Sequence, residues 1–323
     1  FFLLIGLELE REIYQGELSN IKDTILPLFA AIGGMVIPAF LFLVFNFNSP
    51  YSSGFGIPMA TDIAFAIGVL SLLGNKVPNS LKVFLIALAI FDDLGAILLI
   101  AIAYSNDIII SNILWALLVY IILIILNKSK VHHFLPYLLG GIVMWYFIYN
   151  SGIHPTITGV LLAFAIPFDK KREKSCSYKF ENFLHKPVSF FILPIFALVN
   201  TAILINVNAI DLLKQPYTMG IIIGLFVGKP LGILVFSKLG HMFKLYSLPK
   251  GIKFKHIFSV GILAGIGFTM SIFITLLAFD SVEIQNDAKI AILVASCLSA
   301  IVGLLLLNKV LPKNNQINQN EFS

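Results

Sequence analysis

Charge and cysteine are scarce in this sequence. Only 12% of its 323 residues are Asp, Glu, Lys or Arg, whereas a soluble domain carries about 25%. Its two cysteines, Cys176 and Cys297, lack the spacing to a His or to each other that metal sites use. The composition therefore argues against a soluble enzyme and gives no reason to expect a disulfide, a metal centre or a cofactor.

Long apolar runs take the place of charge. Hydrophobic residues make up 58% of the chain and fall into runs near the roughly 20 residues that span a bilayer. The complete runs are 24–47, 57–75, 79–104, 108–127, 134–150, 153–168, 187–206, 216–237, 256–279 and 288–309, with a partial run at 1–7. We predict an all-α polytopic membrane protein.

We expect residues 1–312 to form a single membrane-embedded domain and residues 313–323 a polar, disordered tail. Because the first residue is Phe and the first run is short, we also expect an N-terminally truncated chain whose first helix is missing.

The basic residues predict the orientation of the runs, since Lys and Arg collect in cytoplasmic loops. If the partial run ends in the cytoplasm and the runs alternate, only Lys214, Lys229 and Lys289 of the 22 basic residues lie elsewhere. The net charge of +5 therefore reflects topology and does not indicate a nucleic-acid partner.

The first three and the last three complete runs have opposite directions in this topology. The middle run of each set is interrupted by Gly or Pro and carries polar residues, Thr61-Asp62 in one and Thr269-Met270-Ser271 in the other. Inverted repeats with matching discontinuous helices are typical of transporters that bind their substrate at mid-membrane. The pattern predicts an inverted-repeat transporter rather than an enzyme.

Away from the ends of the apolar runs, four charged residues lie inside them: Asp62, Asp92, Asp93 and Lys229. Each would cost about 2.5–3.5 kcal/mol at the centre of a membrane helix, so we expect them to pair, titrate or bind an ion. Asp92 and Asp93 point about 100° apart on a helix, so one can face a water-filled cavity and the other a neighbouring helix. Lys229 is expected to pair with one aspartate, with snorkelling to the headgroups as the alternative.

Thr61 and Asp62 lie at the predicted break of run 57–75. A broken helix leaves charged helix ends in the membrane, which Asp62 and Lys229 can neutralise. Direct cation binding by Asp62 is the alternative. The Thr61 hydroxyl can coordinate a cation or bond back to its own helix.

A second ionisable set lies at the predicted cytoplasmic loops and comprises Glu8, Glu10, Arg11, Glu12, Glu181 and His185. Composition alone favours an ordinary solvated surface for it. His154 lies at the start of an outer helix, where an imidazole can sense pH.

Four motifs resemble those of the NhaA sodium/proton antiporter family, in the same order along the chain. They are MATDIAFA at 59–66, ALAIFDDLGAI at 87–97, GKPLG at 228–232 and GIGFTMSIFI at 265–274. The resemblance implies two discontinuous transmembrane helices, 57–75 and 256–279, that cross at mid-membrane. It also implies electrogenic, pH-regulated exchange of Na⁺ or Li⁺ for H⁺ by alternating access in the bacterial inner membrane, and a homodimer.

The resemblance also implies roles for individual residues. Asp93 would be the principal cation-binding carboxylate, and Asp92 would assist it and pair with Lys229. Asp62 and Thr61 would lie at the helix break, where the family places dipole compensation and accessory contacts. The pH-sensing set would be Glu8, Arg11, Glu12, His154, Glu181 and His185. Glu10 departs from the family's best-known member, which carries a base there. A passive cation channel and a sodium-coupled solute symporter are the alternative functions.

Overall fold

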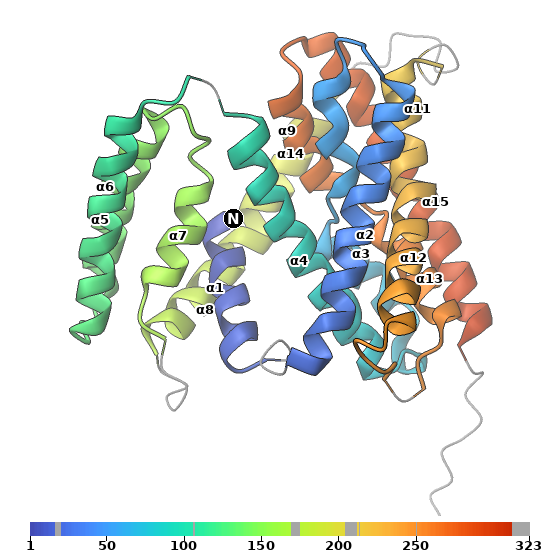
Figure 1. Ribbon diagram of the computed structural model, residues 1–323, viewed down its shortest axis with the longest axis horizontal. Helices are drawn as coiled ribbons and strands as arrows, with labels where there is room; N and C mark the ends of the chain where they lie inside the picture. The colour runs from blue at the N-terminus through green and yellow to red at the C-terminus, as the bar shows by residue number, and fades with distance from the viewer. Residues whose placement is uncertain are drawn as a thin grey trace, which may run out of the picture. The chain divides into compact units, whose positions relative to one another are not determined.

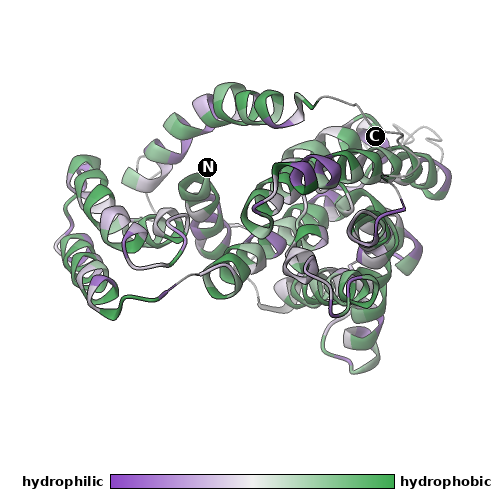
Figure 2. Cartoon of the chain, turned by 90° about the horizontal axis from the view of Figure 1, so that it is seen from above, coloured by the Kyte–Doolittle hydropathy of each residue, from purple (hydrophilic) through white to green (hydrophobic). Residues whose placement is uncertain are grey.

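The computed structural model describes residues 1–16, 21–105, 107–168, 175–203, 212, 214–249 and 251–311. All regular elements among these residues are helical (Figure 1), and hydrophobic residues dominate the helices (Figure 2). The prediction of an all-α membrane protein is confirmed. The predicted polar tail, 313–323, lies outside the described residues.

Within the described ranges, seven helical stretches are long and apolar enough to cross a membrane, and a bent pair makes an eighth. Two predicted spans form shorter helices, α6 (Phe134–Tyr149) with 16 residues and α7 (Ile157–Ala165) with 9. The predicted run 187–206 belongs to a helical stretch that already begins at Cys176. The chain is therefore a multi-pass membrane protein. The lengths of its helices vary more than the lengths of the apolar runs.

Contacts divide the chain into two compact units. The first contains residues 1–24 and 93–204, and the second contains residues 25–92 and 205–323. Helix α4 (Asn79–Ala103) contributes to both, because the division falls between Asp92 and Asp93.

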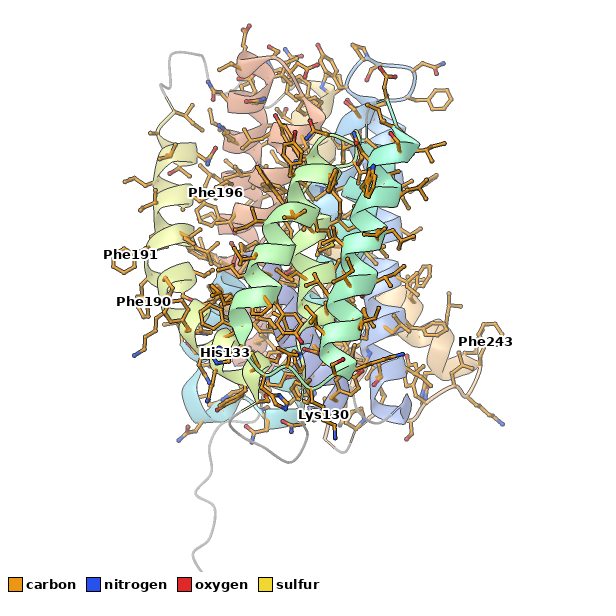
Figure 3. The ribbon with its side chains drawn as sticks, turned by 90° about the vertical axis from the view of Figure 1, so that its left-hand side faces the viewer. Lys130, His133, Phe190, Phe191, Phe196 and Phe243 are labelled. Carbon is orange, nitrogen blue, oxygen red and sulfur yellow. The ribbon has the colours of Figure 1, made fainter. Side chains whose placement is uncertain are left out.

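In the first unit, α1 (Phe2–Tyr14) packs closely along α7. A Cβ atom on Gly6 would lie 2.6 Å from that of Ala163, and one on Gly159 would lie 2.8 Å from the backbone nitrogen of Leu3. The order of these contacts shows that α1 and α7 run parallel. Helix α5 (Ile110–Lys128) forms an antiparallel hairpin with α6, and Lys130 and His133 lie in its turn (Figure 3).

Helix α8 (Cys176–Pro187) continues through the π-helical turn η4 (Val188–Ile192) into α9 (Leu193–Thr201). Phe190 and Phe191 point away from this ribbon (Figure 3) and are 73% and 66% exposed. Outward-facing phenyl rings on an apolar helix fit a lipid-facing surface.

The second unit contains a close helix crossing and two broken helices. Helix α2 (Ile21–Phe45) meets α12 (Lys229–Met242) where a Cβ on Gly33 would lie 2.2 Å from the carbonyl oxygen of Gly232. Small residues of this kind let membrane helices approach backbone to backbone. The other helices of the unit are α11 (Pro216–Ile223), the π-helical η5 (Gly224–Gly228), the short η3 (Gly74–Lys76) and α15 (Val282–Val310).

Both predicted discontinuous helices are broken in the structure. The 3₁₀ helix η2 (Ser52–Met59) is followed by extended backbone at Ala60, and α3 (Ile63–Ser71) begins after Asp62. Helices α13 (Phe254–Ala264) and α14 (Phe268–Ala278) are separated by three residues and bent by 53°. The predicted inverted-repeat feature, a polar break in each middle run, is present.

Candidate functional site at two broken helices

The two helix breaks lie side by side in the second unit. The backbone N–H of Asp62 donates to the carbonyl oxygen of Ile266 at 2.7 Å, which joins one break directly to the other. Ser271 donates from its hydroxyl to the carbonyl oxygen of Ile57 at 2.8 Å. Backbone groups freed by the breaks are therefore satisfied by the partner break, as an apolar membrane interior requires.

Asp62 caps two helix N-termini at once. Its Oδ1 accepts from the N–H of Phe65 in α3 at 3.1 Å, and its Oδ2 accepts from the N–H of Thr269 in α14 at 3.1 Å. Oδ2 also accepts from the Thr269 hydroxyl. With 4% exposure and both oxygens used, Asp62 is positioned to neutralise the positive ends of both helices.

Lys229 pairs with Asp92 inside the unit. Its Nζ lies 2.9 Å from Oδ2 of Asp92, and both side chains are 0% exposed. The ammonium also donates to the carbonyl oxygen of Met59, at the C-terminal end of η2. Full burial rules out snorkelling, and the ammonium serves both a carboxylate and a negative helix end.

Thr61 joins the ion pair to the second break. Its hydroxyl lies 2.7 Å from Oδ2 of Asp92 and 2.9 Å from the carbonyl oxygen of Ala264, the last residue of α13. Oδ1 of Asp92 has no hydrogen-bond partner among the described residues. A methyl group on Gly34 of α2 would lie 3.9 Å from that oxygen. One carboxylate oxygen of Asp92 is thus hydrogen-bonded, whereas the other accepts no hydrogen bond from the described residues.

Asp93 follows on α4 and is 2% exposed. It belongs by contact to the first unit, whereas Asp92 belongs to the second. The structure therefore places Thr61, Asp62, Asp92 and Lys229 together in one unit and Asp93 next to Asp92 along the chain.

Ser296 was missed by the sequence reasoning. Its hydroxyl oxygen accepts from the N–H of Phe268 at 3.2 Å, so it caps α14 beside Asp62. The available signal was a serine inside the mostly apolar run 288–309, which also contains Ser299. Its partner lies 28 residues away in the chain, and spacing alone does not identify it.

The second ionisable set predicted from the sequence gathers at the end of α1. Arg11 donates to Glu181 of α8 and lies 3.4 Å from Oε1 of Glu12, and the Ser177 hydroxyl donates to Glu10 at 3.0 Å. Glu10 is 3% exposed. The solvated surface indicated by composition is therefore wrong for Glu10 and Glu181, because α8 packs over α1 and covers them.

Burial changes the acidity of this cluster. It raises the pKa of Glu8 to about 7, helped by the negative charge of Glu181 and opposed by Arg11. Burial also raises the pKa of Glu10 to about 7, against the stabilising hydrogen bond from Ser177. Both carboxyls therefore lose their protons near neutral pH.

The two histidines of the predicted pH-sensing set differ in location. His185 lies on α8 close enough to Glu181 to influence its charge. His154 lies in the turn before α7, with Nδ1 2.9 Å from the Thr156 hydroxyl oxygen. Since α1 and α7 are parallel and the cluster lies in the C-terminal half of α1, His154, which precedes the N-terminus of α7, is at the opposite end from the cluster.

Comparison of the sequence with known proteins identifies its family. The family model described as Na+/H+ antiporter 1 matches residues 1–307. Na(+)/H(+) antiporter NhaA 1 of Flavobacterium johnsoniae is 60% identical over 314 residues, which cover 97% of this chain and 82% of that protein. Na(+)/H(+) antiporter NhaA of Flavobacterium psychrophilum is 57% identical, over 99% of this chain and 83% of that protein. The chain belongs to the Na+/H+ antiporter 1 family of membrane transporters.

Proposed function

We propose that this protein exports Na⁺ or Li⁺ in electrogenic exchange for H⁺, by alternating access in the bacterial inner membrane. The observation that carries the proposal is the fully buried Asp92–Lys229 pair at the two helix breaks. Membrane helices place ionisable groups in their interior mainly on ion and proton pathways. The names of its relatives, which are Na+/H+ antiporters, support the same ions.

Competition for carboxylates would couple the two fluxes. Oxygen ligands suit hard cations such as Na⁺, and a carboxylate that holds a proton cannot at the same time hold the cation as strongly. We assign the principal cation-binding role to Asp93, with Asp92 and Thr61 as assisting ligands. When the cation binds, Asp92 gives up its ion pair with Lys229 and contacts the cation instead. We further propose that the protein acts as a homodimer.

The membrane potential supplies the driving force in this scheme. If more than one H⁺ enters for each Na⁺ that leaves, every cycle moves net positive charge inward. Each such charge gains about 2.3 kcal/mol per 100 mV of potential. Sodium can then leave the cell even where the pH gradient alone is small.

Neutralising Asp93 tests the proposed function. In everted vesicles containing the full-length protein, we expect Na⁺ to dissipate an imposed pH gradient, and Asp93→Asn to reduce that rate at least about tenfold, because one lost charge-assisted contact is worth over about 1.4 kcal/mol. Asp107→Asn, at an exposed position of the first unit, is the matched control and should behave as the wild type.

Two results would contradict this proposal. Sodium flux without linked proton movement would indicate a channel, and sodium uptake that requires an organic solute would indicate a symporter. Undiminished exchange in Asp93→Asn would remove the cation site from that residue.

The acidic cluster of the first unit predicts pH regulation. Because the pKa of Glu10 is raised to about 7 in the folded protein, its favourable effect on folding is complete below the unfolded pKa and is lost as pH rises through about 7. Deprotonation then adds buried negative charge beside Ser177 and loosens the packing of α1 against α8. We propose that this loosening contributes to alkaline activation.

Glu10→Gln keeps that position neutral at every pH. We expect its antiport rate to rise less steeply than that of the wild type between about pH 6 and pH 8. Glu283→Gln, an exposed carboxyl at the start of α15, is the control and should leave the profile unchanged. An identical profile in Glu10→Gln would show that this carboxyl does not regulate the protein.

A further inference from the structure

The Thr61 hydroxyl has two acceptors and one hydrogen. Oδ2 of Asp92 lies 2.7 Å from it and the carbonyl oxygen of Ala264 lies 2.9 Å from it. An ionised carboxylate and a backbone carbonyl can only accept. The hydroxyl therefore donates to one of them at any moment. Oδ2 of Asp92 has the Lys229 ammonium at 2.9 Å as a second donor, whereas the Ala264 carbonyl has no such second donor among the described residues.

The Ala264 carbonyl depends on this hydroxyl. In an unbroken helix it would accept from the N–H of Phe268, four residues on, but that N–H donates to Ser296 instead. Backbone amides just after the break bond elsewhere too, Gly265 to Ile262 and Ile266 to Leu263. Among the described residues Thr61 is the hydrogen-bond donor to Ala264 at the end of α13.

A cation beside Asp92 changes the balance between the two acceptors. A positive ion attracts the hydroxyl oxygen and repels its hydrogen, so Thr61 can face the ion only when its hydrogen points elsewhere. Within reach, the other acceptor is the Ala264 carbonyl. Turning the O–H bond is sufficient, and no covalent bond breaks.

We propose that Thr61 couples cargo occupancy to the helix break: it donates to Asp92 when the site is empty and to Ala264 when a cation is bound. Loading the site then supplies the missing hydrogen bond at the C-terminal end of α13. The proposal rests on the proposed function, and it makes Thr61 a positioning residue for the broken helix in addition to a cargo contact.

Amide hydrogen exchange at fixed pH tests this coupling. In the full-length protein we expect Na⁺ to slow exchange in the segment around residues 261–268 at least about threefold. Thr61→Val keeps the side-chain shape but has no hydroxyl, and should lose the response and lower the maximal antiport rate about tenfold. Thr61→Ser retains a hydroxyl and should recover the exchange response.

A matched control separates coupling from damage to the fold. Ser71→Ala removes an exposed hydroxyl from the same broken helix, where it bonds only locally to Gly68, and should keep both the response and the rate. Equal Na⁺ responses in Thr61→Val and the wild type would overturn the proposal, as would a lost response with an unchanged antiport rate. Absence of antiport in the wild type would instead contradict the proposed function.

Discussion

Replacing Lys229 with methionine is expected to destabilise the protein by about 3–5 kcal/mol, because it leaves a buried carboxylate without its counter-charge. Lys229 and Asp92 are both 0% exposed and 2.9 Å apart, so water does not replace the lost ammonium. The Met59 carbonyl at the end of η2 loses a donor as well. Chemical unfolding in detergent micelles measures the effect.

A double variant separates the charge from the volume. Asp92→Leu with Lys229→Met replaces the ion pair by apolar side chains of similar size, a change that is often neutral for stability in buried pairs. We expect it to recover most of the stability lost in the single variant while antiport is absent. Lys238→Met, at an exposed position of the same helix, should cost less than about 1 kcal/mol. A Lys229→Met protein as stable as the wild type would mean that Asp92 is not ionised in the folded state.

Removing the carboxylate of Asp62 is expected to cost about 2–4 kcal/mol, because two helix caps are lost together. Asp62→Ala leaves the N–H groups of Phe65 and Thr269 and the Thr269 hydroxyl without an acceptor in a buried place. A single surface cap lost in water is worth only about 0.5–2 kcal/mol. The difference arises because this carboxylate joins α3 to α14.

Asparagine at this position distinguishes capping from charge. Asp62→Asn keeps one accepting oxygen and should retain roughly half of the stabilisation. If Asp62→Ala unfolds at the same denaturant concentration as the wild type, the carboxylate does not hold the two helices together. A stable Asp62→Ala protein without antiport would assign the residue to cation binding, the alternative that its sequence position left open.

The buried charges could be predicted from the sequence because they stand out in apolar runs. Their pairing could not. Asp92 and Asp93 are neighbours, and only the fold shows that Asp92 is the one that meets Lys229, on a helix far along the chain. Thr61 likewise had several possible partners, and only the fold brings it to Ala264, 203 residues on.

Helix lengths show a second limit. The run 153–168 is mostly apolar, yet α7 occupies only Ile157–Ala165. Pro155 lies in the turn before the helix, and Ile166 is extended because it precedes Pro167. Hydropathy identifies membrane segments without marking such ends. Glu10 shows the same limit for burial, since its partner Ser177 is 167 residues away.

The π-helical turn Gly224–Gly228 lies directly before Lys229. A π-turn is one residue longer than the corresponding α-helical turn, and each residue of an α-helix turns the chain by about 100°. If η5 became α-helical while keeping all its residues, Lys229 would swing about 100° around the helix axis and away from Asp92. A change of helical geometry that leaves the sequence intact is thus sufficient to separate the central ion pair.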